Sequence, residues 1–174
     1  MNKMKQVKPN KNGPYDQGYF KPINENKYAS ADKVIIYRSS LELKFCQLCD
    51  ASAKITKWAS EPFSLKYEHP FIMDPSNPRK KKICNYYPDY LIELVLNENN
   101  KKIYIVEIKP ISLILNPKPI SKFASKKQKE NYLYKVKQIA VNQAKAKAAK
   151  VFCEQKGYEY MFITENFINK LSRI

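Results

Sequence analysis

The chain has 174 residues, which is enough for one domain with a hydrophobic core and short for two. Lysine and arginine number 32 against 16 acidic residues, so the formal net charge is +16, and 44% of the residues are hydrophobic. The apolar content excludes wholesale disorder, and the basic excess predicts a polyanionic partner: nucleic acid first, an anionic membrane surface second.

Residues 1–30 are predicted to form a flexible basic arm, followed by a single domain over residues 31–174. The first segment contains three prolines and two of the three glycines of the chain, and its apolar residues show little periodicity. Such a segment orders only on a partner. It lacks the apolar stretch of a secretory signal, and the apolar runs elsewhere are too short to span a bilayer, so no membrane partner is expected.

A helix is predicted over residues 39–52. Ser39 and Glu42 have the spacing of a capping box, in which each side chain bonds to the backbone of the other. An apolar stripe at helical spacing follows, formed by Leu41, Phe45 and Leu48. On this helix Cys46 and Cys49 either begin a zinc site or are buried thiols. Four cysteines among many lysines do not suggest a disulfide framework, so a reducing compartment is expected.

The middle of the chain predicts extended structure. Residues 55–58 and 63–67 are strand-like, and residues 73–82 look like a polar loop because of their prolines and charges. Strands over residues 86–96 and 102–109 are predicted to form a hairpin around a four-residue polar turn.

The second half predicts a connector over residues 111–120, a long helix over residues 125–156, a strand over residues 158–164 and a short helix over residues 167–171. Gly157 is a natural end for the long helix. A strand that reaches a later strand through a long helix is a crossover connection. The order therefore predicts an α/β fold with a mixed β-sheet flanked by helices.

One pair of predicted strands carries a candidate catalytic site. Asp89 follows Pro88 at the start of the first strand, and Glu107 and Lys109 point to the same face of the second. If the strands pair, the two carboxylates meet beside an ammonium group. Carboxylate oxygens are the ligands that Mg²⁺ prefers, and the carbonyl of Ile108 is a further candidate ligand. The combination suits metal-assisted hydrolysis of phosphodiesters with Mg²⁺ or Mn²⁺.

Two other acids compete for roles in this site. Glu42 could complete it from the first helix, although the capping box offers a purely structural role. Glu93 shares a strand face with Asp89 and is an alternative partner, but it has no lysine two residues later. Nucleoside triphosphate hydrolysis is excluded, because the chain has only three glycines and no glycine-rich phosphate loop.

Basic residues gather in three runs, at residues 1–12, 79–82 and 118–150, and the last contains ten lysines and a single acid, Glu130. Runs of this kind around an acidic site favour DNA over a merely solvated surface. Three aromatic residues of the last run either face the core, the default, or stack on bases: Phe123, Tyr132 and Tyr134. The candidate DNA contacts of the chain are Arg38, Arg79, Lys80, Lys126, Lys127, Asn142 and Lys145.

The pattern of Glu42, Pro88-Asp89 and Glu107-Ile108-Lys109 resembles the PD-(D/E)xK nuclease superfamily. Residues around it, from about 35 to 168, resemble the head-completion nucleases of T-even-type tailed phages. The segments that carry this likeness include Tyr37–Phe45, Trp58–Pro62, Val106–Pro110 and Gly157–Glu165.

The resemblance implies a restriction-endonuclease-like core and a Mg²⁺-dependent endonuclease acting on double-stranded DNA late in phage assembly. It implies Asp89, Glu107 and Lys109 as the catalytic set, with Glu42 as the helix carboxylate. In this superfamily the long helix often adds a polar residue, for which Asn142, Gln143 and Lys145 are candidates. The expected setting is the host cytoplasm during assembly and then the virion, with portal or head–tail connector proteins as partners.

Two alternatives to a phage endonuclease use the same residues. A structural virion protein at the head–tail or portal junction would keep the fold and bind DNA without needing to cut it. A nuclease that resolves junctions or cuts transposon ends would use the same chemistry on another DNA structure.

Overall fold

The structure, a computed structural model, describes residues 8–10, 12–13, 15–30 and 34–171. In this part of the chain the α-helices are α1 (Ser40–Ala51), α2 (Lys126–Lys156) and α3 (Glu165–Leu171). The strands are β1 (Gly18–Phe20), β2 (Ile35–Tyr37), β3 (Ile55–Ser60), β4 (Leu65–Asp74), β5 (Asn77–Tyr86), β6 (Tyr90–Asn97), β7 (Asn100–Ile108) and β8 (Glu159–Ile163). Two short 3-10 helices are η1 (Glu25–Lys27) and η2 (Ile111–Leu113).

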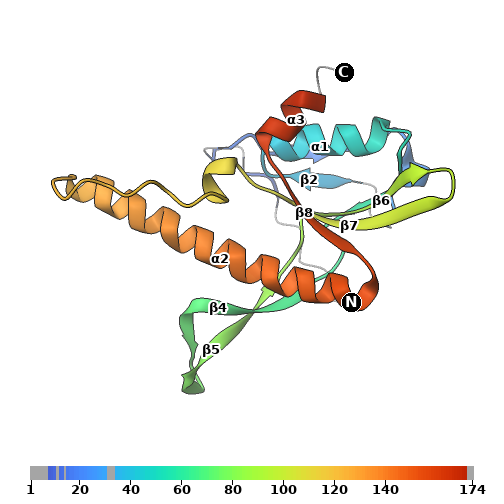
Figure 1. The fold of residues 1–174 in the computed structure, drawn as a ribbon. Helices are drawn as coiled ribbons and strands as arrows, with labels where there is room; N and C mark the ends of the chain where they lie inside the picture. Colours follow the sequence, from blue (N-terminus) through green and yellow to red (C-terminus); the bar gives the residue numbers. More distant parts are fainter. Residues whose placement is uncertain (1–7, 11, 14, 31–33, 172–174) are drawn as a thin grey trace.

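The central sheet has four strands in the order β3-β6-β7-β8. The first three are antiparallel neighbours, whereas β7 and β8 are parallel and joined by the crossover through α2. Helix α1 lies over one face of this sheet and α2 over the other (Figure 1). The predicted mixed sheet and both long helices are therefore confirmed.

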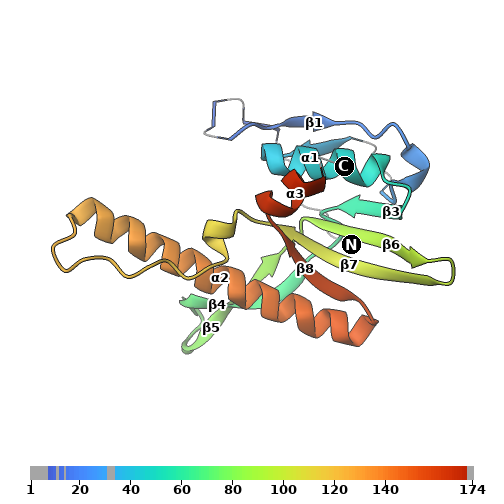
Figure 2. The same cartoon turned by 45° about the horizontal axis from the view of Figure 1, so that its top comes forward.

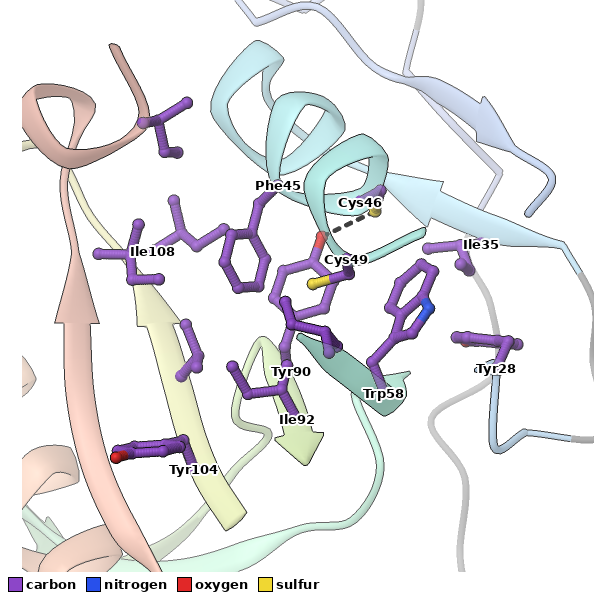
Figure 3. Packing of buried hydrophobic residues seen from close by; sticks show 14 residues of the cluster. Tyr28, Ile35, Phe45, Cys46, Cys49, Trp58, Tyr90, Ile92, Tyr104 and Ile108 are labelled. Carbon is purple, nitrogen blue, oxygen red and sulfur yellow. Dashed lines mark hydrogen bonds between the residues drawn. The ribbon is translucent and has the colours of Figure 1, made fainter. Parts of the chain in front are cut away.

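The larger hydrophobic cluster lies between α1 and the sheet (Figure 3). Phe45 of α1 packs edge-on against Tyr90 of β6, with 4.9 Å between the ring centroids. Trp58 of β3 has no exposed surface and lies beside Tyr90 and Tyr28. Val106 of β7 belongs to the same cluster. This core holds β6 and β7 firmly at the position where their polar residues meet.

Cys46 and Cys49 are part of this core. Both thiols are fully buried, and Cys46 Sγ lies 3.2 Å from the hydroxyl of Tyr90. Burial raises the pKa of Cys46 to about 12 and raises that of Cys49 well above its usual value. Both cysteines pack in the hydrophobic core, and no group of three or more His, Cys, Asp or Glu side chains that could hold a metal ion exists among the described residues, so the structure supports the buried-thiol interpretation of this pair.

The polar loop predicted over residues 73–82 is wrong, because these residues form the end of β4, a tight turn and most of β5. Asp74 pairs with Asn77, and Asp74 Oδ1 accepts hydrogen bonds from the backbone and hydroxyl of Ser76. Both faces of this outer hairpin are largely exposed, so its sequence lacks the apolar alternation by which a strand is recognised.

The strand predicted over residues 86–96 starts too early, because its first residue, Tyr86, is the last residue of another strand. β5 ends at Tyr86 and β6 begins at Tyr90, with Tyr87, Pro88 and Asp89 between them. Proline cannot donate a ladder hydrogen bond, which accounts for the break. The break matters because it frees the side chain of Asp89 from the regular sheet.

Helix α2 has two different halves. Its second half is anchored to the sheet by buried residues from Ile139 to Cys153, and it ends at Gly157 in the left-handed conformation, φ 70°. Residues 126–137 are almost entirely exposed, and this half extends beyond the sheet (Figures 1 and 2). Phe123 and Tyr134 are 96% and 63% exposed, so the default expectation that they face the core is wrong.

No helix within the described residues has the length and apolar character to cross a bilayer.

Residues 15–30 contact the domain across the boundary predicted at residue 30. β1 pairs with β2, and the backbone N–H groups of Ile23 and Asn24 donate to the buried carboxylate of Asp50 at 2.9 and 3.0 Å. This part of the arm predicted to be flexible therefore contacts α1 and β2. The lysines of residues 1–7 and 11 lie outside the described residues. The division at residue 30 stays a prediction.

The contacts of Asp50 predict that residues 15–30 contribute to the stability of the domain. Asp50→Ala would leave two backbone N–H groups without their acceptor and should lower the free energy of unfolding by about 2–3 kcal/mol. Urea unfolding measures this value, with the exposed Asp16→Ala as control. A variant of Asp50 as stable as the wild type would mean that the segment is not integral to the domain.

Candidate active site

The pairing of β6 with β7 brings Asp89 and Glu107 together. Tyr90 is opposite Val106 in this antiparallel ladder. Asp89, which precedes Tyr90, is therefore next to Glu107, which follows Val106. Val106 and Ile108 face the core under α1, and Glu107 therefore projects from the opposite side of β7, toward α2. The geometry expected from the two predicted strands is present.

Three predicted metal ligands converge on one ammonium group. Lys109 Nζ lies 2.7 Å from Glu107 Oε1, 3.6 Å from Asp89 Oδ2 and 3.1 Å from the carbonyl oxygen of Ile108. A single positive charge thus lies within 3.6 Å of two carboxylates and a carbonyl. The pocket is already organised to hold a cation, and in this structure the cation is the chain's own lysine.

Asp89 is fixed by the backbone of β7. The N–H of Ile108 donates to Asp89 Oδ2 at 2.7 Å. Burial and the negative charge of Glu107 raise the pKa of Asp89 to about 7, although the ammonium of Lys109 and the Ile108 N–H act in the opposite direction. The site therefore holds its carboxylates at an electrostatic cost, which an added cation would relieve.

Lys109 remains protonated in this environment. Burial lowers the pKa of its ammonium, but the charges of Asp89 and Glu107 outweigh burial and raise the pKa above its usual value. The lysine is therefore a hydrogen-bond donor and a positive charge at neutral pH rather than a base.

Tyr86 is a site residue that the sequence analysis missed. Its hydroxyl donates to Glu107 Oε2 at 2.5 Å, so the two oxygens of Glu107 are held by Tyr86 and Lys109. Burial and the nearby charge of Glu107 raise the pKa of Tyr86, which keeps the hydroxyl protonated as a donor. The signal that could have found it is Pro88, which ends β5 just beyond Tyr86 and places that strand end beside the site.

Lys145 approaches the site from α2 through this tyrosine. Its Nζ lies 5.4 Å from the ring centroid of Tyr86 and 5.9 Å from that of Tyr67. The other polar candidates on the helix differ in position. Asn142 is buried and donates to the carbonyl of Leu113, which fixes the connector after β7, whereas Gln143 is exposed.

Only half of the predicted capping box forms at Glu42. Ser39 Oγ accepts from the Glu42 N–H at 3.2 Å, but the Glu42 carboxylate accepts from the Arg38 N–H at 2.8 Å and from the Ser39 hydroxyl at 3.1 Å instead of the Ser39 backbone. It also lines a cavity of about 50 Å³ together with Asp89 and Glu61, with room for ordered water. Burial raises the pKa of Glu42.

Glu61 is a second residue that the sequence did not single out. It is the non-glycine residue with a positive φ within the described chain, at 43°, and its N–H donates to the carbonyl of Asp89 at 3.0 Å. Its side chain accepts from the Arg38 guanidinium at 2.8 Å. Strained backbone of this kind gathers at functional sites. The predicted DNA contact Arg38 is thus an ion-pair partner at the rim of the cavity.

Glu93 does not join the site. Its carboxylate accepts from the Thr56 hydroxyl and forms an ion pair with Lys101 at 3.4 Å, near the other end of the same strand pair. The remaining predicted DNA contacts are exposed and far along other elements: Arg79 and Lys80 on β5, Lys126 and Lys127 at the start of α2.

The donor set fits Mg²⁺ or Mn²⁺. Among the described residues no three His, Cys, Asp or Glu side chains form a ready cluster for a metal. Mg²⁺ does not require one, because it usually binds one or two carboxylates and keeps waters and substrate phosphates as its other ligands. Asp89, Glu107 and the Ile108 carbonyl are oxygen donors of that kind, and their convergence on the Lys109 ammonium shows that they can surround a cation.

The raised pKa of Asp89 predicts a pH-dependent stability. Between its unfolded pKa of about 4 and its folded pKa of about 7, the folded state binds the proton more tightly, so metal-free stability falls as pH rises through this window. Asp89→Asn, which can still accept from Ile108, should raise the melting temperature by a few degrees at about pH 8, with the gain shrinking toward about pH 5. Melting curves in EDTA measure this difference, and Asp16→Asn is the exposed control. An equal gain at both pH values would contradict it.

Comparison with known proteins agrees with this geometry. The model of the family described as TnsA-like endonuclease N terminal matches residues 52–165, more than half of the chain. The matched range contains Asp89, Glu107 and Lys109 and begins after Glu42. No curated protein matches the sequence. The chain therefore belongs to the TnsA-like endonuclease N-terminal family, a PD-(D/E)xK family with a restriction-endonuclease-like fold, and this membership implies a nuclease whose substrate is DNA.

Proposed function

We propose that the protein is a Mg²⁺-dependent DNA endonuclease that hydrolyses phosphodiester bonds at the site around Lys109. The observation that carries the proposal is the convergence of Asp89, Glu107 and the Ile108 carbonyl on one positive charge. Family membership supports the same reaction class. Asp89, Glu107 and Ile108 are the proposed metal ligands, and Mn²⁺ is a suitable substitute.

The bound metal would neutralise charge on the phosphate and acidify a water molecule. The protein side chains supply the rest. Lys109, protonated and held beside both carboxylates, can donate a hydrogen bond to a phosphate oxygen or to the attacking water. Tyr86 and the Ile108 N–H hold Glu107 and Asp89 in place, so neither carboxylate must reorganise during the reaction.

Glu42 is proposed as an additional catalytic carboxylate. It lines the cavity next to Asp89, and its charge contributes to the raised pKa of Asp89. From this position it can accept a proton from a water molecule in the cavity.

The proposed DNA contacts fall into two groups. Arg79, Lys80, Lys126 and Lys127 are exposed and are suited to phosphate contacts. Arg38, Asn142 and Lys145 are engaged within the protein, and their proposed contribution is at the edge of the active site.

The proposal predicts which substitutions abolish cleavage. Asp89→Asn and Glu107→Gln should each reduce plasmid nicking in Mg²⁺ by about 100-fold or more and weaken Mn²⁺ binding measured by calorimetry. Lys109→Ala should lose activity to a similar extent while still binding metal. The amide oxygen of Glu42→Gln can still accept from the Arg38 N–H and the Ser39 hydroxyl, so this variant should retain stability and lose activity.

Glu93→Gln and Lys101→Ala are matched controls, because they change the same residue types on the same two strands away from the site. Both should cut like the wild type. Nicking that survives Asp89→Asn or Glu107→Gln would exclude the proposed site.

Two biological settings are candidates for this nuclease. The likeness of residues 35–168 to phage head-completion nucleases supports action on DNA at a packaged head or portal vertex, with portal or connector proteins as partners. The TnsA-like family match supports cleavage at transposon ends. Phosphodiester hydrolysis at the site around Lys109 is common to both settings. A structural role in the virion would need the DNA-binding surface but not the hydrolysis.

Particle association and substrate choice separate these settings. For head completion, the protein should co-purify with full capsids, and a site variant should still be incorporated. For transposon-end or junction cleavage, purified protein should prefer such DNA structures over linear duplex and be absent from particles.

A further inference from the structure

The outer half of the β4–β5 hairpin extends away from the sheet (Figures 1 and 2). The inner half is covered, since Leu65, Tyr67 and Tyr86 pack in one cluster with Ala149 of α2. No comparable cluster covers the outer half within the described residues, where Ile83 is 54% exposed. A two-stranded ribbon without a covering layer is marginally stable on its own, so a group of exposed apolar residues on it indicates an interaction site.

A wide bulge in β4 pushes apolar side chains outward. Glu68 pairs with Ile83 and Met73 with Lys81, so residues 69–72 lie opposite Lys82 alone. His69 Nδ1 accepts hydrogen bonds from the backbone N–H of Phe71 at 3.2 Å and from that of Ile72 at 3.1 Å. These two side chains are 48% and 46% exposed. The bulge is thus a fixed feature that presents a small apolar prominence.

The strand opposite this prominence is strongly basic. Four consecutive cations occupy the outer half of β5: Arg79, Lys80, Lys81 and Lys82. The acids on the outer hairpin are Glu68 and Asp74, and the carboxylate of Asp74 accepts hydrogen bonds from the backbone and hydroxyl of Ser76. A ribbon with cations on both faces and an apolar projection matches the chemistry of duplex DNA, whose grooves admit a two-stranded β-ribbon and whose base steps accept apolar wedges.

The hairpin is also rooted at the candidate active site, because β5 ends at Tyr86, which donates to Glu107. We propose that the outer β4–β5 hairpin binds a groove of duplex DNA, with Arg79–Lys82 on the phosphates and Phe71 and Ile72 wedged against the base pairs. This inference deepens the proposed nuclease function and rests on it for the identity of the substrate. The hairpin would then set the position of the duplex relative to Lys109.

Salt-dependent binding in the absence of cleavage tests the phosphate contacts. Anisotropy of a labelled duplex in EDTA, over a series of salt concentrations, should show a log–log slope smaller by about 2 for Lys80→Ala/Lys82→Ala. Lys54→Ala/Lys57→Ala removes two exposed lysines at β3 and should keep the wild-type slope. All substituted side chains are exposed, so the melting temperature should not change.

The wedge has its own readout. Phe71→Ala/Ile72→Ala removes no charge, so it should weaken binding by about tenfold with an unchanged salt slope. Ile23→Ala, at a highly exposed isoleucine on another part of the surface, should bind like the wild type. If only the charge variant loses affinity, the wedge is overturned and the phosphate contacts stand.

Failure of the hairpin can be told apart from failure of the proposed function. If both hairpin variants bind and cut like the wild type, the inference is overturned while the nuclease stands. If the wild type binds duplex in EDTA through the hairpin but does not cut in Mg²⁺, the catalytic proposal fails and the hairpin interface stands. If the wild type does not bind duplex at all, the inference fails, whatever partner the hairpin has.

Discussion

The ammonium of Lys109 is the charge on which the candidate site depends. Two carboxylates and a carbonyl point at it from two different chain segments, and it lies within 3.6 Å of all three. Without a positive charge there, Asp89 and Glu107 would repel each other in a partly desolvated pocket. Burial and the charge of Glu107 raise the pKa of Asp89 even with the ammonium of Lys109 beside it. A pocket in this condition attracts further positive charge.

The position of that ammonium follows from the way β7 is built. Val106 and Ile108 face the large core under α1, whereas Glu107 projects on the opposite side. Beyond the strand, the backbone N–H of Lys109 donates to the carbonyl of Ile163, which extends the parallel pairing with β8 by one residue. One short segment is therefore anchored on one side by hydrophobic packing and carries polar groups on the other. Rigid support of this kind is what a preorganised site requires.

The parts of the fold that contribute least to the core carry the most positive charge. The outer β4–β5 hairpin and the first half of α2 both extend beyond the sheet, and both are rich in exposed lysines. Most residues of both extensions are exposed, so neither contributes much to the hydrophobic core. Both projections lie on the α2 side of the sheet, and the side chain of Glu107 points to the same side. This arrangement suits a ligand much larger than the candidate site itself.

The sequence by itself determined the elements with strong local signals and the chemistry at the centre of the site. The Ser39 cap of the first helix, the apolar runs of β6 and β7, and the long helix ended by Gly157 depend on near neighbours in the chain. The sequence also indicated that Asp89 and Glu107 meet if the two strands pair, but not the register of the pairing. Asn97 is opposite Asn100 at the turn, and an irregularity between Val95 and Asn97 shifts the rest of the ladder by one residue, so that Tyr90 is opposite Val106.

Contacts between distant segments were decided only by the tertiary structure. The outer hairpin was missed because a strand exposed on both faces has no apolar alternation. Glu61 has no local signal for its role, and Tyr86 has only the nearby Pro88. Each meets the site only after β4–β5 packs against α2 and β3 pairs with β6. The ordering of residues 15–30 likewise depends on the carboxylate of Asp50, which is 26 residues beyond Asn24 in the chain. Local patterns fix local geometry, whereas burial and pairing across the fold are settled when the whole chain packs.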